Sequence, residues 1–134
     1  MAKLKIEVAD DFEEAARDTV YQIMLGCVKE EYPLLMKDVK NARITAWWDR
    51  AVDIIPADGG KGVGVEKILE YYHLDRSQAL AFGDGCNDIE MLQTVGLGVA
   101  MGNASEEVKK ATDTVCGNVA EDGIYHFCVS HGLI

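Results

Sequence analysis

The sequence predicts an α/β protein in which a parallel sheet, built from βαβ units, follows a smaller α+β unit. Two observations lead to this fold class. Two adjacent strands joined by a tight turn end the part before residue 57, and short apolar strands alternate with helical periods after it. A Gly-rich connection, 56–61, separates the two patterns. We therefore predict two units, residues 1–56 and 57–134, in a chain long enough for one domain but too short for two of full size.

The first unit begins with a segment, Leu4 to Val8, in which apolar and charged residues alternate as in a half-buried strand. Asp10 and Asp11 can cap a helix running towards Thr19. The next predicted elements are a β-prone strand at 21–28, a helix at 32–39 with Pro33 in its first turn, and two adjacent strands at 42–48 and 51–55. This order gives a small α+β unit.

The second unit alternates helices with short apolar strands. Helices are predicted at 65–72, 87–95, 105–111 and 124–130, and strands at 79–82, 97–101 and 114–115. Because these strands carry few polar residues, we expect them to be buried on both faces, as in a parallel sheet between helices.

The composition excludes several classes of function. The chain is 49% apolar and 27% charged, with a net charge of -10, which argues against nucleic acid or a membrane surface as a partner. A phosphate site would need a local cation or a metal to overcome this charge. The four cysteines form no CxxC pair, so neither a zinc site nor a disulfide framework is indicated. No apolar run has the length of a signal peptide or membrane helix, and we expect a cytoplasmic protein.

The residues that point to chemistry lie in the run Gly83-Asp84-Gly85-Cys86-Asn87-Asp88, where a predicted strand ends and a helix begins. Ligands bind at the carboxyl ends of strands in open α/β sheets. Asp84 and Asp88 suit a hard cation such as Mg²⁺, and the helix start offers backbone N–H groups to an anion. Upstream, Lys61 follows a Gly-Gly pair at another helix start, where it can serve as a cation for a phosphate.

Together these motifs resemble those of the haloacid dehalogenase (HAD) superfamily, and of its Cof-type phosphatases in particular. The run 83–92 is similar to the fourth HAD motif, 96–104 to the strand and loop after it, Lys61 to the third motif, and 121–124 to the stretch before the terminal helix. The residues before 54 resemble, more loosely, the second half of the α+β cap inserted in that core. The resemblance therefore implies the C-terminal half of a HAD-like Rossmannoid parallel sheet, preceded by part of an α+β cap.

The resemblance also implies roles for four residues. Asp84 would be a Mg²⁺ ligand, and Asp88 a second acid that binds the metal or orients its surroundings. Asn87 would contact the phosphoryl group that is transferred. Lys61 would neutralise the phosphate and the nucleophile, which makes Lys61 and Asp88 the catalytic residues of this chain. The implied reaction is Mg²⁺-dependent hydrolysis of a small phosphorylated metabolite through an aspartyl-phosphate.

One motif of the family is missing from the sequence. An Asp-x-Asp pair, which supplies the nucleophile and the general acid/base, occurs nowhere in the chain. The Ser or Thr of the second motif is also missing, because the nearest candidate, Thr45, lies in the cap-like stretch. We therefore expect a fragment that is inactive alone.

A structural consequence follows for the strand at 79–82. In the family fold this strand pairs with the first core strand, which carries Asp-x-Asp. Without that strand, 79–82 forms an exposed edge that favours association. The expected partner is the missing N-terminal segment or a second copy of the chain.

Two other functions remain open from the sequence. The first is a non-catalytic module that binds metal or phosphate, or pairs with another subunit, and the missing Asp-x-Asp favours it. The second is a fragment of the phosphorylation domain of a P-type ATPase, which carries a similar Gly-Asp-Gly-x-Asn-Asp run. Against this reading, the chain has no membrane helix after the motif.

Overall fold

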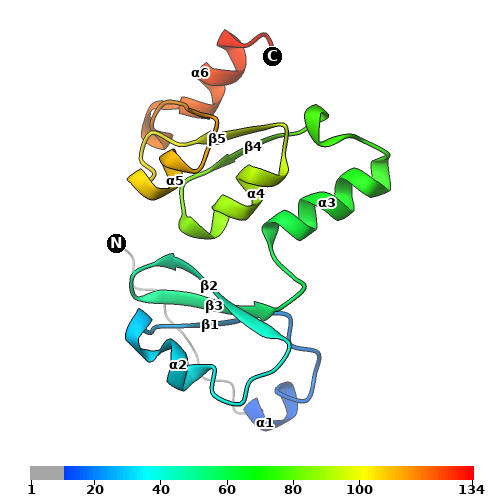
Figure 1. The fold of residues 1–134 in the computed structure, drawn as a ribbon, viewed down its shortest axis with the longest axis vertical. Coiled ribbons are helices and arrows are strands. Elements are labelled where there is room, and N and C mark those ends of the chain that lie inside the picture. The colour runs from blue at the N-terminus through cyan, green and yellow to red at the C-terminus, as the bar shows by residue number, and fades with distance from the viewer. Residues whose placement is uncertain (1–10) are drawn as a thin grey trace.

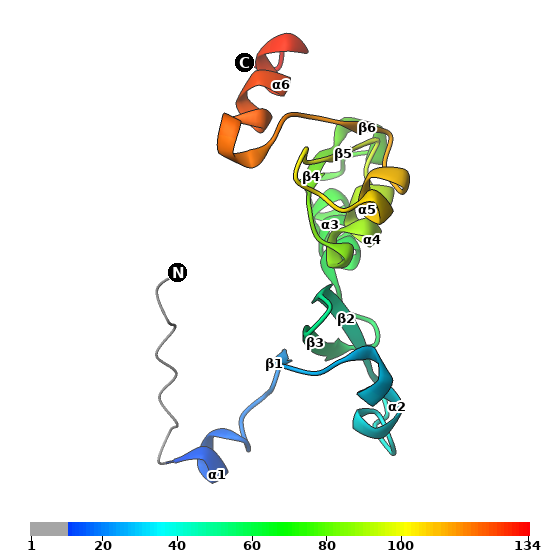
Figure 2. The same ribbon diagram turned by 90° about the vertical axis from the view of Figure 1, so that its left-hand side faces the viewer.

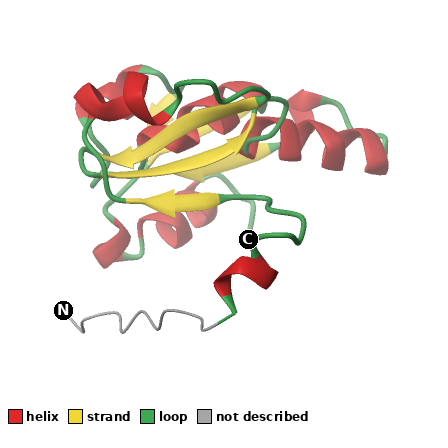
Figure 3. Ribbon diagram, turned by 90° about the horizontal axis from the view of Figure 1, so that it is seen from below, coloured by secondary structure: helices red, strands yellow, loops and turns green. Residues whose placement is uncertain are grey.

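A computed structural model describes residues 11–134, which form two three-stranded sheets, one above the other in Figure 1. The chain passes from the lower sheet to the upper one at 57–60 (Figure 2). Strands occupy the middle of the molecule, and helices lie around them (Figure 3). The strand predicted at 4–8 and the capping residue Asp10 lie outside the described residues.

The lower sheet is antiparallel, with strand order β1-β3-β2. Its strands are β1 (Ile23–Leu25), β2 (Ala42–Trp48) and β3 (Ala51–Pro56), and its helical segments are α1 (Phe12–Ala15), η1 (Lys29–Glu31) and α2 (Tyr32–Leu35). The adjacency of β2 and β3 is as predicted. The predicted helices were too long, and 32–39 ends early because Asp38 adopts a left-handed conformation with φ 63°.

The upper sheet is parallel, as predicted, with strand order β4-β5-β6. Its strands are β4 (Leu80–Gly83), β5 (Leu97–Ala100) and β6 (Thr114–Val115). The helical segments are α3 (Lys61–Tyr72), η2 (Arg76–Gln78), η3 (Cys86–Asp88), α4 (Ile89–Thr94), α5 (Glu106–Lys110), η4 (Val119–Glu121) and α6 (Gly123–Ser130).

Both faces of the upper sheet are covered by helices. Successive side chains of β4 point to opposite faces of the sheet and show what packs on each. Ala81 belongs to a buried cluster with Leu92 of α4 and Val108 of α5. Phe82 packs edge-to-face on Phe127 of α6, with ring centroids 5.4 Å apart. The expected burial on both faces is therefore met at β4. Within residues 11–134, β4 pairs only with β5 and is an edge of the sheet.

Two further observations concern the described part of the chain. None of its helices has the length and apolar character needed to cross a membrane. Its four cysteines are free thiols, in line with the expectation that they form no disulfide framework.

Candidate active site

The run 83–88 forms the loop between β4 and α4, at the carboxyl end of the parallel strands. Gly83 ends β4, and a Cβ atom there would lie 2.6 Å from the Cβ of Asp88, closer than real side chains approach. The glycine therefore lets the loop fold back over Asp88. This close approach is enough to explain why the strand ends in glycine, whether or not the loop binds a ligand.

Asp88 is the most heavily engaged side chain of the loop, and it is only 6% exposed. Its Oδ2 accepts hydrogen bonds from the backbone N–H groups of Asp84 and Gly85, both at 3.0 Å. Its Oδ1 accepts from the ammonium group of Lys61. Burial by itself would raise the pKa of Asp88, but Lys61 and the two N–H groups together hold the pKa below its ordinary value. Asp88 is therefore ionised and fixes both the loop and Lys61.

Lys61 is the first residue of α3, and its side chain is half exposed. Gly60 before it has φ 136°, and a Cβ atom there would lie 2.3 Å from the guanidinium of Arg43. Glycine suits this position because other residues rarely adopt this backbone conformation, and a side chain here would also displace the guanidinium of Arg43. Lys61 is thus held by Asp88 on one side and remains accessible to a ligand on the other.

Asp84 and Asn87 complete the predicted set, with Asp84 exposed and Asn87 half-buried. The Oδ2 of Asp84 accepts a hydrogen bond of 2.9 Å from Asn103 Nδ2. Asn103 is itself held by the N–H of Val119, at 3.1 Å from its Oδ1. The sequence analysis assigned no role to Asn103. Its place just after β5, the strand next to β4, is the signal that could have found it.

All four predicted residues line one cavity of about 460 Å³. Lys61, Asp84, Asn87 and Asp88 lie on its upper side, together with Gly85, and the lower sheet contributes Met24, Trp47 and Asp53. A neighbouring cavity of about 380 Å³ is also lined by Lys61 and Asn87, and by Thr45. The site is therefore an open cleft lined by both sheets, and the residues of its lower half were not predicted.

The carboxylates of Asp84 and Asp88 are the oxygen donors available for the Mg²⁺ that the sequence predicts. Within residues 11–134, no three His, Cys, Asp or Glu side chains gather closely enough to hold a metal on their own. Mg²⁺, however, is commonly bound by one or two carboxylates, with water and phosphate oxygens as the other ligands. Asp84, which is exposed and oriented, and Asp88, whose carboxylate has further lone pairs, fit that requirement.

Arg43 of β2 connects the lower sheet to the upper unit. Its Nη2 donates to the carbonyl of Gly59 at 2.7 Å and to Glu90 Oε2 of α4 at 2.5 Å. Gly59 lies two residues before Lys61, so Arg43 holds the connection from which the lysine projects. No signal in the sequence marked this contact, since 47 residues separate Arg43 from Glu90.

Replacing Arg43 by methionine is expected to loosen the connection between the sheets without unfolding either of them. The ion pair with Glu90 is partly exposed and contributes less than about 1 kcal/mol. We therefore expect a small change in melting temperature but several-fold faster amide hydrogen exchange at 57–60. Arg50→Met, at the exposed β2–β3 turn, is the matched control. Unchanged exchange at 57–60 in Arg43→Met would show that Arg43 does not hold the connection.

Comparisons with known proteins identify the family of the chain. The sequence profile of one family, described as haloacid dehalogenase-like hydrolase, matches residues 2–128. YkrA, a putative phosphatase of Bacillus subtilis, is 36% identical over 115 residues, which are 86% of this chain and 44% of YkrA. YitU of the same organism, a 5-amino-6-(5-phospho-D-ribitylamino)uracil phosphatase, is 34% identical over 125 residues, covering 87% of this chain and 46% of YitU.

A solved structure shows the same likeness in three dimensions. BT1666 of Bacteroides thetaiotaomicron, from a study of HAD-superfamily phosphatases, has a TM-score of 0.83 with this chain at 34% identity. The match covers 95% of this chain and 47% of BT1666. The chain thus spans about half the length of these phosphatases.

Proposed function

Because the chain belongs to the haloacid dehalogenase-like hydrolases, we propose that it supplies the metal-binding and phosphate-binding half of a Cof-type phosphatase for small phosphorylated metabolites. One observation carries this proposal. The ion pair of Lys61 with Asp88, beside the oriented carboxylate of Asp84, faces a cavity at the carboxyl end of β4. In a chain of net charge -10, Lys61 is the lysine that lines this cavity among residues 11–134, and it would neutralise a phosphate bound there.

Each residue of the site has a distinct task in this proposal. Asp84 and Asp88 would hold Mg²⁺, which supplies positive charge to the phosphoryl oxygens. Lys61 would donate to a phosphoryl oxygen, and the hydrogen bond to Asp88 holds its ammonium group beside the cavity. The amide of Asn87 is a second donor to the same phosphoryl group. Asn103 fixes the orientation of Asp84 and does not touch the substrate.

The nucleophile has to come from outside this sequence, which holds no Asp-x-Asp. We propose that a segment carrying Asp-x-Asp pairs with the edge of β4. One Asp of that segment would attack phosphorus to give an aspartyl-phosphate, while the other protonates the departing alcohol. Water then hydrolyses the aspartyl-phosphate. A second copy of the chain at the same edge would cover β4 but would not supply this motif.

A non-catalytic module remains the second candidate, since the missing Asp-x-Asp would also suit a protein that only binds metal and phosphate. The P-type ATPase reading is weaker, because the similar proteins YkrA and YitU are described as phosphatases. Turnover in the presence of an Asp-x-Asp segment separates the phosphatase from the non-catalytic module.

The phosphate site itself can be tested on the chain as it stands. Inorganic phosphate is expected to bind in the presence of Mg²⁺, and Lys61→Met should weaken that binding by about 10- to 100-fold, the value of a charge-assisted hydrogen bond. Asp84→Asn should remove the dependence on Mg²⁺. Titration calorimetry measures both, with Lys67→Met, exposed elsewhere on α3, as the matched control. Equal phosphate binding by Lys61→Met and wild type would refute the proposed site.

A further inference from the structure

The side chain of Asn103 links the predicted metal ligand Asp84 to the C-terminal part of the chain. Its Nδ2 donates to Asp84 Oδ2 at 2.9 Å, and its Oδ1 accepts from the backbone N–H of Val119 at 3.1 Å. Because an amide has donors at one end only, the N–H of Val119 decides which end of Asn103 faces the carboxylate. The opposite orientation would set oxygen against oxygen and donor against donor. The direction of the Asp84 carboxylate therefore depends on where Val119 lies.

Segment 117–123, which joins β6 to α6, packs against the turn that carries Asn103. The N–H of Gly102 donates to the carbonyl of Gly117 at 3.0 Å. A Cβ atom at Gly102 would lie 2.8 Å from the backbone nitrogen of Asn118, closer than real side chains approach. The hydrogen bond between Asn103 and the segment is therefore supported by direct contact between the two backbones.

The same segment is attached to α6. The side chain of Asn118 accepts a hydrogen bond of 2.9 Å from the N–H two residues further along, and its carbonyl accepts one of 3.1 Å from Gly123, the first residue of α6. Phe127 seats α6 on the parallel sheet, where its ring packs edge-to-face on an aromatic ring of β4. A continuous series of contacts thus runs from the sheet through α6 and segment 117–123 to Asp84.

These contacts matter for a metal because Asp84 is otherwise unrestrained. The side chain of Asp84 is exposed, and within residues 11–134 its one hydrogen bond is the one from Asn103. Mg²⁺ demands near-ideal octahedral geometry, so a carboxylate that is free to rotate loses conformational entropy when the ion binds. Groups that orient the ligands of a metal commonly change its affinity by about 10- to 100-fold.

We infer that segment 117–123 sets the Mg²⁺ affinity of Asp84 through Asn103, and that bound Mg²⁺ in turn holds this segment in place. The second half follows from linkage, because two coupled equilibria shift each other by the same factor. Asn103 and Asn118 are positioning residues, which touch neither the metal nor the phosphate. The inference rests on the proposed function, since it requires Mg²⁺ to bind at Asp84.

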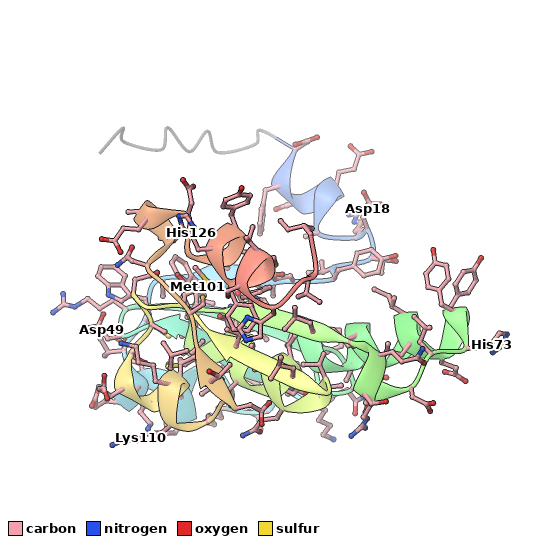
Figure 4. All side chains as sticks on the ribbon, turned by 90° about the horizontal axis from the view of Figure 1, so that it is seen from above. Asp18, Asp49, His73, Met101, Lys110 and His126 are labelled. Carbon is pink, nitrogen blue, oxygen red and sulfur yellow. The ribbon has the colours of Figure 1, made fainter. Side chains whose placement is uncertain are left out.

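The test is a Mg²⁺ titration of the ¹⁵N-labelled full chain, followed by two-dimensional NMR. In the wild type, the amide resonances of Asp84 and Val119 should move together and give one dissociation constant. The amide of His73 is the reference that should not move, because it lies at the other end of α3 from Lys61 (Figure 4).

Variants of the two positioning residues should weaken Mg²⁺ binding to different extents. Asn103→Ala should raise the dissociation constant about 10-fold and abolish the movement at Val119. Asn118→Ala leaves the Asn103 side chain intact and alters only the segment that holds it, so it should raise the constant by about 2- to 5-fold. Gln93→Ala, which removes an exposed amide from α4, is the matched control and should bind Mg²⁺ like the wild type.

The same titrations separate failure of this inference from failure of the proposed function. If Asn103→Ala or Asn118→Ala binds Mg²⁺ as tightly as the wild type, then these residues only hold the segment in place, and the inference is wrong although the metal site stands. A wild-type Val119 amide that ignores Mg²⁺ has the same meaning. If Mg²⁺ moves no resonance at 83–88, or moves them equally in Asp84→Asn, then both the inference and the proposed function are overturned.

Discussion

The chain alone is expected to hydrolyse p-nitrophenyl phosphate no faster than its Asp84→Ala variant. In the proposed site Lys61, Asp84 and Asp88 would bind and neutralise a phosphate, but none of them belongs to an Asp-x-Asp motif. Hydrolysis of phosphate monoesters is among the slowest uncatalysed reactions, and loss of a nucleophile in covalent enzymes lowers the rate by a factor on the order of 10⁴–10⁶. A metal ion and a lysine do not replace the missing nucleophile.

Restoring the nucleophile is the positive arm of this experiment. A segment that carries Asp-x-Asp and pairs with the edge of β4, fused before residue 1, should produce Mg²⁺-dependent turnover that Asp84→Ala abolishes. The same fusion with both motif aspartates changed to Asn is the control. Turnover by the unfused chain that disappears in Asp84→Ala would mean that another residue of this sequence attacks phosphorus. Mass spectrometry of the assayed sample excludes a longer contaminant.

Loss of the Asp88 carboxylate should be the most destabilising single change in the site. Asp88→Ala leaves two backbone N–H groups and the Lys61 ammonium without their acceptor, at a position that is 6% exposed. We expect the free energy of unfolding to fall by about 2 to 4 kcal/mol. Urea unfolding followed by tryptophan fluorescence measures the change, with Asp18→Ala as the exposed control.

The same residue gives the stability a defined dependence on pH. Because the folded pKa of Asp88 lies below its ordinary value of 3.8, the ionised carboxylate stabilises the fold above that value. This contribution is lost as the pH falls through the lowered folded pKa. The difference in unfolding free energy between wild type and Asp88→Asn should therefore be full at neutral pH and shrink below pH 3.8. A difference that stays constant down to pH 2 would contradict the ionised ion pair.

The parts of the fold that sequence could predict are those set by neighbours along the chain. The apolar run at 97–101 becomes β5, and the glycine-rich loop after β4 carries Asp84 and Asp88 where a strand end meets a helix start. The helix at 32–39 was overestimated because its apolar spacing says nothing of the left-handed turn at Asp38.

The parts that sequence could not predict depend on contacts between distant segments. The ion pair of Arg43 with Glu90 joins residues 47 positions apart, and neither residue belongs to a recognisable motif. The position of Asp53 beside Lys61 and Asn87 in one cavity follows only from how the lower sheet packs against the upper one. The pairing of Lys61 with Asp88 was not predicted either, since nothing in the spacing of the two residues requires it.

The carbonyl held by Arg43 has a kinetic consequence for an enzyme assembled around this chain. Gly59 and Lys61 are two residues apart, so the position of the lysine depends on how the lower sheet is seated. A substrate too large for the lower sheet to take up this position would still bind through Mg²⁺. The ammonium group of Lys61 would then not be aligned with its phosphoryl group. We expect such a substrate to be discriminated against in kcat more than in KM, so that selection by size would take place during the chemical step instead of at binding.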